Sequence, residues 1–139
     1  MKNLTLKNIA AACGGVYHGD AALLEQCVDS ITTDSRQVKP GCLFVPIVGA
    51  RADGHDYIGQ VIEKGALCTL TERELPDAGF PYIRVGSSLQ SVKDIAEFYL
   101  RELKIPVVGI SGSVGKTSTK EMISAVLSQR YRVLKTQGN

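Results

Sequence analysis

The chain has 139 residues, of which 44% are hydrophobic and 22% are charged, and its formal net charge is +2. This composition is typical of a soluble globular chain, and the absence of a long basic run argues against nucleic-acid binding. Residues 1–7 lack the apolar core of a signal peptide, and no apolar run approaches the ~20 residues of a membrane span.

The predicted elements of residues 1–103 alternate between helix and strand and indicate a compact α/β domain. Thr5 can cap a first helix that ends at Ala12, before a glycine pair. Strands are expected over residues 16–18, 28–33, 42–48, 66–70 and 82–85. Helices are expected over residues 56–64 and from a cap at Ser87 or Ser88 to about residue 103. The apolar residues predicted to place this last helix on the core are Leu89, Val92, Ile95, Ala96, Tyr99 and Leu103.

The four cysteines are widely spaced and form no C-x-x-C pair, which argues against a metal site. Cys42 and Cys68 lie within apolar runs, so we interpret them as small buried hydrophobic residues of a protein in a reducing cytosol. His18 is expected at the surface.

Lys104-Ile105-Pro106 breaks the long helix, and we place a domain boundary there. A strand over 107–111, a glycine-rich loop, a helix over about 117–129 and a strand over 131–135 are predicted to follow. The apolar stripe of that helix, from Met122 to Leu127, is interpreted as core. The segment is thus the beginning of a larger parallel sheet, whose missing strands should leave open edges and apolar surface that favour self-association.

The glycine-rich turn at residues 109–119 has the order of a phosphate-binding loop: apolar strand, small residues, Gly-Lys-Thr, helix. Lys116 is expected to contact the β- and γ-phosphates, and the Thr117 hydroxyl to ligate Mg²⁺. The strict pattern requires glycine where Ile110 stands, so the spacing is the variant G-x-x-G-x-x-G-K-T. The glycines do not fit a dinucleotide fingerprint, whereas an ordinary strand–helix turn is the structural alternative.

Two separate segments resemble the Mur ligases, the ATP-dependent amide ligases of peptidoglycan precursor synthesis. Residues 32–46, continuing through 49–58, are similar to the family's uridine-nucleotide-binding segment, and the phosphate loop is the second. Within the family, Thr119-Lys120-Glu121-Met122 and Thr136-Gln137-Gly138-Asn139 resemble the member that adds D-alanyl-D-alanine. A tripeptide-forming ligase, another ligase of this type and a non-catalytic UDP-sugar-binding module are the alternatives.

The resemblance implies a small N-terminal α/β domain, residues 1–103, that binds UDP-muramoyl peptide. Residues 104–139 would be the first strand–loop–helix–strand of an incomplete P-loop ATPase domain. In the implied reaction, ATP phosphorylates the carboxylate of UDP-N-acetylmuramoyl-tripeptide, and the amine of D-alanyl-D-alanine attacks the acyl phosphate. ATP and Mg²⁺ are the implied cofactors, Lys116 and Thr117 the catalytic residues, and the bacterial cytoplasm the location. The residues that the resemblance implies for binding the ATP phosphates are Gly112, Ser113, Val114, Gly115, Lys116, Thr117 and Ser118.

The resemblance also implies that further Mg²⁺ ligands and the whole acceptor-binding region lie beyond Asn139. The chain is therefore expected to be an inactive piece of a ligase that is monomeric at full length. The resemblance aligns five residues with uridine-diphosphate contacts: Thr33, Ser35, Ala50, Arg51 and Ala52.

Each of these assignments has a simpler structural alternative. Asp34-Ser35-Arg36 is also a typical turn sequence, and Arg51 is also typical of a solvated loop cation. Asp53, His55 and Asp56 cluster without a convincing metal-ligand spacing, and the two aspartates are expected at the start of a helix.

Overall fold

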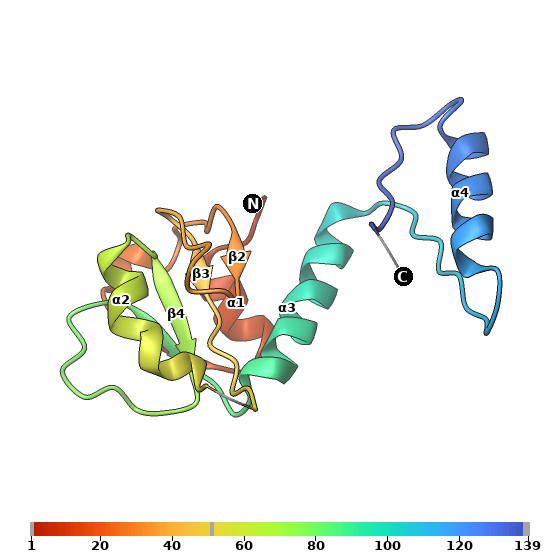
Figure 1. The fold of residues 1–139 in the computed structure, drawn as a ribbon. Coiled ribbons are helices and arrows are strands. Elements are labelled where there is room, and N and C mark those ends of the chain that lie inside the picture. Colours follow the sequence, from red (N-terminus) through yellow and green to blue (C-terminus); the bar gives the residue numbers. More distant parts are fainter. Residues whose placement is uncertain (1, 51, 138–139) are drawn as a thin grey trace. The chain divides into compact units, whose positions relative to one another are not determined.

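The computed structural model describes residues 2–50 and 52–137, and it divides into two compact units, residues 1–104 and 105–139. The helices of the first unit are α1 (Leu6–Ala12), α2 (Ile58–Glu63) and α3 (Ser88–Leu103), with 3₁₀ turns η1 (Ala21–Leu23) and η2 (Gly54–Tyr57). Its strands are β1 (Val16–His18), β2 (Ile31–Thr32), β3 (Leu43–Phe44), β4 (Cys68–Thr71) and β5 (Tyr82–Arg84). The second unit contains α4 (Lys116–Leu127) (Figure 1). The model therefore has the mixed α/β architecture that the sequence predicts.

The first unit is built on one five-stranded sheet in the order β1-β5-β4-β3-β2. Strands β2 to β5 are mutually parallel, and β1 pairs with β5 in the antiparallel sense. The ends of β2 and β3 are in register, since Thr32 pairs with Phe44, and so are those of β4 and β5, since Thr71 pairs with Arg84. Strand β4 continues two residues beyond Thr69, the partner of Phe44. The loops that follow β2, β3, β4 and β5 therefore leave from the same side of the sheet, here named the carboxyl edge. Open parallel sheets bind their ligands at this edge.

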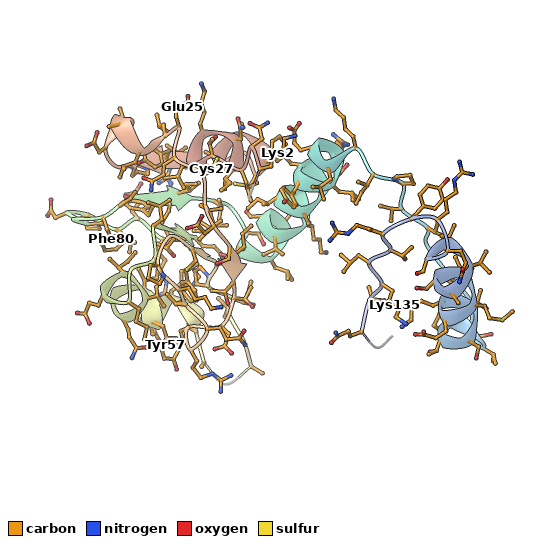
Figure 2. The ribbon with its side chains drawn as sticks, turned by 90° about the horizontal axis from the view of Figure 1, so that it is seen from above. Lys2, Glu25, Cys27, Tyr57, Phe80 and Lys135 are labelled. Atoms are coloured by element: carbon orange, nitrogen blue, oxygen red, sulfur yellow. The ribbon has the colours of Figure 1, made fainter. Side chains whose placement is uncertain are left out.

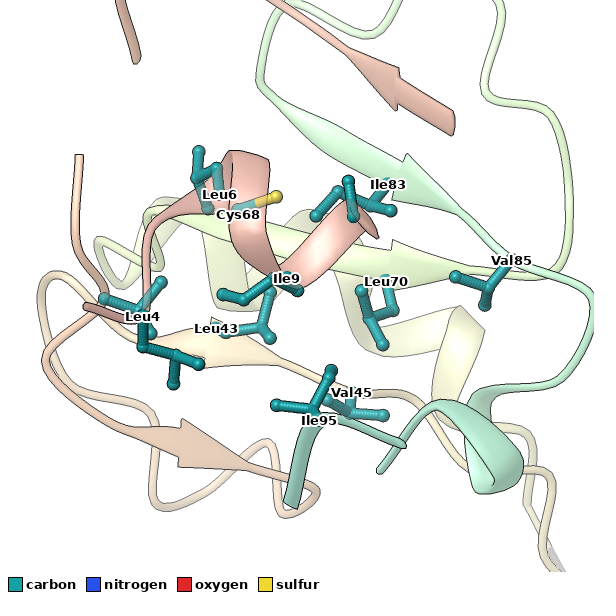
Figure 3. Close-up of a cluster of buried hydrophobic side chains, with 12 residues drawn as sticks. Leu4, Leu6, Ile9, Leu43, Val45, Cys68, Leu70, Ile83, Val85 and Ile95 are labelled. Carbon is teal, nitrogen blue, oxygen red and sulfur yellow. The ribbon is translucent and has the colours of Figure 1, made fainter. Parts of the chain in front are cut away.

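Helices cover both faces of the sheet. Successive side chains of a strand point to opposite faces, so the same strand contributes apolar side chains to a core on each side. Leu43 and Val45 join a cluster with residues of α1 and α3, and members of this cluster are shown in Figure 3. Cys42 and Phe44 instead join a second cluster with Ile58 and Val61 of α2. The burial of Cys42 and Cys68, both 0% exposed, confirms that these cysteines are core residues.

Side chains at the helix ends fix where the helices begin. The Thr5 hydroxyl accepts the Asn8 N–H at 3.1 Å, and the Ser87 hydroxyl accepts the Gln90 N–H at 3.3 Å, which confirms Thr5 and selects Ser87 as caps. At its other end α3 stops at Lys104, whose φ of 50° and ψ of 38° are left-handed. Ile105 follows, and as the residue before Pro106 it is disfavoured from helical geometry.

The buried face of α3 matches the predicted one only in part: Ile95 is buried, and Val92 and Tyr99 pack against the core. Leu89 is 58% and Leu103 38% exposed, and Ala96 is also exposed, whereas Ser88, Ser91 and Ile95 are buried. The Ser91 hydroxyl donates to the Ser87 carbonyl at 2.7 Å, so a small polar residue can be buried without an unpaired hydroxyl. A prediction that counts only apolar residues therefore places part of the buried face of this helix about one residue too far along the chain.

Several predicted strands are shorter than expected. The runs over 28–33 and 42–48 retain two paired residues each, in β2 and β3, and Val48 is 59% exposed. The helix predicted over 56–64 begins earlier, as the 3₁₀ turn at Gly54. His18 is half-buried and stacks on Tyr82 at 4.6 Å between ring centroids, so its predicted surface position is wrong.

The second unit lacks the two strands predicted over 107–111 and 131–135. A strand exists only where a neighbour supplies hydrogen bonds, and the two segments do not pair with each other. The predicted core stripe of α4 is exposed, with Met122 and Val126 each at 71%. The expectation of open apolar surface is thereby confirmed, and the core interpretation of the stripe is wrong. Within the described parts of the chain, no helix has both the length and the apolar character to cross a membrane.

Candidate functional site

The loop before α4 has the backbone geometry of an anion site. Gly112 and Gly115 have φ of 152° and 79°, in a region that favours glycine, and Gly115 is the N-cap of α4. No side chain caps this helix, and its first bond to the cap runs from the Thr119 N–H to the Gly115 carbonyl at 2.9 Å. The amides of residues 116–118 precede that bond and point out of the helix N-terminus, where they favour negative charge.

Lys116 brings a positive charge to the same loop. Its ammonium donates to the Gly112 carbonyl at 2.6 Å, so the side chain folds back over the loop. Lys116 is half-buried, while the other residues of the 112–118 loop are exposed, Val114 at 90%. The structure thus brings Gly112, Gly115 and Lys116 together in one exposed turn. Thr117 follows in the first turn of α4, with its residue surface exposed.

The charges of the second unit also suit a phosphate. Residues 105–139 contain one acidic residue, Glu121, against five basic ones: Lys116, Lys120, Arg130, Arg132 and Lys135. Glu121 pairs with Lys135, the residue labelled in Figure 2, and their hydrogen bond lowers the pKa of the glutamate. Lys120 donates to the Thr136 carbonyl at 3.0 Å, which further ties residues 131–137 to α4.

The residues present fit a magnesium ion only in part. Thr117 supplies one hydroxyl, and no group of three potential metal-ligating side chains occurs within residues 2–50 and 52–137. Mg²⁺ usually keeps several waters and binds through few protein groups plus substrate phosphates. One hydroxyl beside bound phosphates is compatible with that mode, and a preformed protein cage is absent from the part of the chain described.

The segment after β2 contains both turn chemistry and two open hydroxyls. The Asp34 carboxylate accepts the Arg36 backbone N–H at 2.9 Å and also the Arg36 guanidinium, which holds the pKa of Asp34 well below its usual range. Thr33 is exposed and Ser35 half-buried, and neither hydroxyl has a hydrogen-bond partner among the described residues. The Ser35 carbonyl accepts from Lys64 at 3.0 Å. The turn positions the backbone and leaves the two predicted contact residues available.

The loop after β3 contains the other predicted contacts. The Gly54 N–H donates to the Ile47 carbonyl at 3.0 Å, and the Gly49 N–H donates to the Ala52 carbonyl at 2.9 Å, which closes a tight turn. A Cβ at Gly54 would lie 2.7 Å from the Ile47 nitrogen, so this position requires glycine. Ala50 and Ala52 are exposed at the tip, and Arg51 lies outside the described residues. Because β2 and β3 are neighbours, both predicted contact segments leave the carboxyl edge side by side in strand order.

Sequence reasoning missed the role of His55 at the base of that loop. His55 is buried, at 7% exposure, and its Nε2 accepts the Glu72 backbone N–H at 3.2 Å. Its Nδ1 lies 2.6 Å from Asp53 Oδ1. Asp53 caps η2 by accepting the His55 N–H at 2.9 Å, as predicted for this aspartate, and pairs with Arg73. The Asp-Gly-His order before an apolar helix was the available signal.

Comparison with known proteins identifies the family. The model of the Mur ligase family catalytic domain matches residues 28–122, and that of the Mur ligase middle domain matches residues 110–139. A UDP-N-acetylmuramoyl-tripeptide–D-alanyl-D-alanine ligase of Bacillus subtilis is 38% identical over 137 residues, covering 97% of this chain and 30% of its own length. A UDP-N-acetylmuramoyl-L-alanyl-D-glutamate–2,6-diaminopimelate ligase of Chlorobium phaeobacteroides is 41% identical over 106 residues, covering 73% of this chain and 21% of its own.

A solved structure agrees with these relatives. The MurF ligase of Thermotoga maritima, crystallised in complex with ADP, matches with a TM-score of 0.72 and 34% identity, covering 79% of this chain and 26% of that one. The chain spans about 30% of the length of the curated D-alanyl-D-alanine ligases that it matches. The catalytic-domain model by itself extends over most of the chain, and the middle-domain model matches the segment that begins in the glycine-rich loop. The chain therefore belongs to the Mur ligase family.

Proposed function

We propose that this chain supplies the uridine-nucleotide-binding part and the ATP-phosphate loop of a ligase that adds D-alanyl-D-alanine to UDP-N-acetylmuramoyl-tripeptide. The observation that carries the proposal is the 38% identity along 97% of the chain to a Bacillus subtilis ligase named for that reaction. In this proposal the first unit binds the UDP-muramoyl peptide and the second begins the ATP-binding domain. The open hydroxyls at the carboxyl edge and the uncapped α4 support the two roles.

On the ATP side, the chain's own groups position and neutralise phosphate. The amides at the start of α4 and the Lys116 ammonium would hold the phosphate oxygens, and Lys116 would exchange its bond to the Gly112 carbonyl for one to phosphate. The Thr117 hydroxyl would hold Mg²⁺, which, when bound, neutralises the charge that develops on the transferred phosphoryl group. A carboxylate becomes a good acyl donor once its oxygen is phosphorylated, so an amine can then form the amide.

On the nucleotide side, the proposed contacts are short polar groups and backbone. The hydroxyls of Thr33 and Ser35 would donate to the uridine nucleotide, and Ala50 and Ala52 leave the loop backbone accessible to it. Arg51 would supply the charge for the pyrophosphate. This arrangement binds the substrate away from the reacting carboxylate, which leaves the peptide end free to reach ATP.

Residues 1–139 by themselves are proposed to bind without turning over. Electrostatic catalysis requires donors fixed in a site that excludes water, whereas six of the seven residues of the 112–118 loop are exposed. Among the described residues of the second unit, the one carboxylate is engaged by Lys135. Binding by this chain and catalysis are therefore separable properties.

The diaminopimelate-adding reaction is the second candidate, because the Chlorobium phaeobacteroides relative has a higher identity, 41%, over its shorter match. The two reactions differ in the peptide on the nucleotide, a dipeptide for that relative and a tripeptide for a D-alanyl-D-alanine ligase. Substrate choice therefore discriminates between them.

Calorimetry on the chain tests the proposal. UDP-N-acetylmuramoyl-tripeptide is expected to bind, and more tightly than UDP-N-acetylmuramoyl-dipeptide, while Mg-ATP binds at a separate site. Tighter binding of the dipeptide favours the diaminopimelate reaction, and absence of uridine-nucleotide binding contradicts both. In the presence of D-alanyl-D-alanine and Mg-ATP, chromatography is expected to detect no UDP-muramoyl-pentapeptide.

A further inference from the structure

A buried histidine links three loops of the carboxyl edge. His55 stands at the end of the loop after β3, and its Nε2 bonds the first amide after β4, that of Glu72, at 3.2 Å. The Glu72 carboxylate in turn accepts the Ser88 N–H at 2.6 Å, at the start of α3 after β5. These contacts join the exits of three neighbouring strands by a chain of hydrogen bonds.

The hydrogen bonds determine the protonation state of the imidazole. A backbone N–H can only donate, so Nε2 of His55 must be the unprotonated acceptor. The neutral ring then has its proton on Nδ1, which donates to Asp53 Oδ1 at 2.6 Å. Asp53 accepts the His55 backbone N–H at 2.9 Å and pairs with the Arg73 guanidinium, so its charge is compensated on both oxygens. His55 therefore acts through two different bonds, one on each ring nitrogen.

The same bonds determine where the loop after β3 stands. Within the loop, two backbone hydrogen bonds close the turn, and its tip at Ala50 and Ala52 is exposed. The attachment to the neighbouring β4 exit runs through Asp53 and His55, which are at the base of the loop. A loop that is closed at its base and bonded to the neighbouring strand exit is already ordered. It therefore loses less conformational freedom when it binds a ligand.

We propose that His55 is a positioning residue for nucleotide binding: as the Nδ1–H tautomer, it anchors Asp53, and with it the end of the loop after β3, to the exit of β4, and so raises the affinity for the uridine nucleotide. This rests on the proposed function, in which Ala50 and Ala52 of that loop contact the nucleotide. His55 is buried and is not assigned a contact with the ligand.

Three substitutions separate the two bonds. His55→Asn retains a donor near the Nδ1 position and loses the acceptor for Glu72, while His55→Gln can retain that acceptor and loses the bond to Asp53. His55→Ala loses both. UDP titrated calorimetrically into the folded chain is expected to bind about fivefold more weakly to the Asn and Gln variants, as for one lost hydrogen bond, and more weakly still to the Ala variant.

The other histidine provides the matched control. His18 is half-buried against Tyr82 on β1 and contributes to no loop of the carboxyl edge, so His18→Ala is expected to lower stability and leave UDP affinity unchanged. Urea unfolding of each variant shows whether stability alone explains an affinity change. Arg73→Gln removes the exposed partner of Asp53 and does not alter the core, so it is expected to weaken UDP binding about twofold. It keeps the proposal testable if the His55 variants fail to fold.

One further readout, together with the UDP titration, keeps the outcomes distinct. Nitrogen-15 spectra of the imidazole are expected to show the Nδ1–H tautomer, and the opposite tautomer overturns the proposal. If the unmodified chain binds UDP and the three His55 variants bind it equally well, His55 has no positioning role. If the unmodified chain does not bind UDP, the proposed function itself fails, and the affinity role of His55 fails with it.

Discussion

The two units have similar helices but opposite burial. In the first unit, strands deliver alternating side chains to both faces, and residues such as Phe44, Leu70 and Ile83 are at most 1% exposed. In the second unit, no described residue is buried, although Val107, Val108 and the stripe of α4 are as apolar. The difference shows that an amphipathic pattern specifies which face of an element is apolar, while burial depends on a partner layer.

The largest expected difference between the units is in hydrogen exchange. The amides of β4 and β5 should exchange more slowly than those of α4 by on the order of a thousandfold, since opening energies range from near zero to the global value. Isolated helices below about 12–15 residues are marginal in water, and α4 has 12 residues. Exchange measured residue by residue on the monomer tests this. Equal protection of α4 and β4 would mean that the second unit has a stable core of its own.

A matched pair of leucines tests the comparison energetically. Leu70→Ala should lower the free energy of unfolding by about 2–5 kcal/mol, because Leu70 is fully buried against both α1 and α3 residues. Leu134→Ala removes the same atoms from a side chain that is 98% exposed, and it should change the free energy of unfolding by less than about 0.5 kcal/mol. Urea denaturation measures both. A cost at Leu134 comparable to that at Leu70 would contradict the assigned difference.

The glycine-rich loop at residues 112–118 gives a further test, because a ligand is proposed to bind in the unit whose described residues are not buried. Lys116→Ala should weaken Mg-ATP binding about tenfold, because one charge-assisted hydrogen bond to phosphate is lost. The control is Lys120→Ala on the same helix, whose ammonium is directed to the Thr136 carbonyl. Calorimetry gives both affinities. The urea midpoint of the first unit should be unchanged in each variant, and equal ATP binding by the Lys116 variant would remove the assigned role.

The smallest expected effect is the acid dependence of the first unit. Hydrogen bonds from His55 lower the pKa of Asp53 below its unfolded value of about 3.9. Its contribution is therefore fully present above the unfolded pKa and lost as pH falls through the folded pKa. Asp53→Asn should reduce the loss of stability between pH 7 and pH 3, measured by urea midpoints.

Two comparisons complete that measurement. Asp56→Asn, whose carboxylate lies 3.9 Å from Arg73 and is 70% exposed, should leave the acid dependence nearly unchanged. Glu121 also has a lowered pKa, but it lies in the second unit and should not affect unfolding of the first. An Asp53 variant with the acid dependence of the unmodified chain would contradict the role given to its carboxylate.

Sequence patterns predicted the architecture of the first unit and the order of its elements, because caps such as Thr5 and Ser87 act locally. They also predicted a glycine-rich turn before a helix, where Gly115 has a positive φ, while the binding of phosphate there stays a prediction. They failed where a distant partner decides. Within the described residues of the second unit, the segments expected as strands around residues 107 and 131 do not pair with each other, and the buried face of α3 includes Ser91. His55 was missed because its role depends on Glu72, 17 residues away in the chain.

The end of α3 has a practical consequence for building related ligases. Lys104 ends the helix in a left-handed conformation, and Pro106 independently prevents its continuation. The stop is thus encoded by residues outside both the sheet and the phosphate loop. We expect this stop to be portable: the first unit, taken through Lys104, should keep α3 intact when a different polypeptide is joined after it.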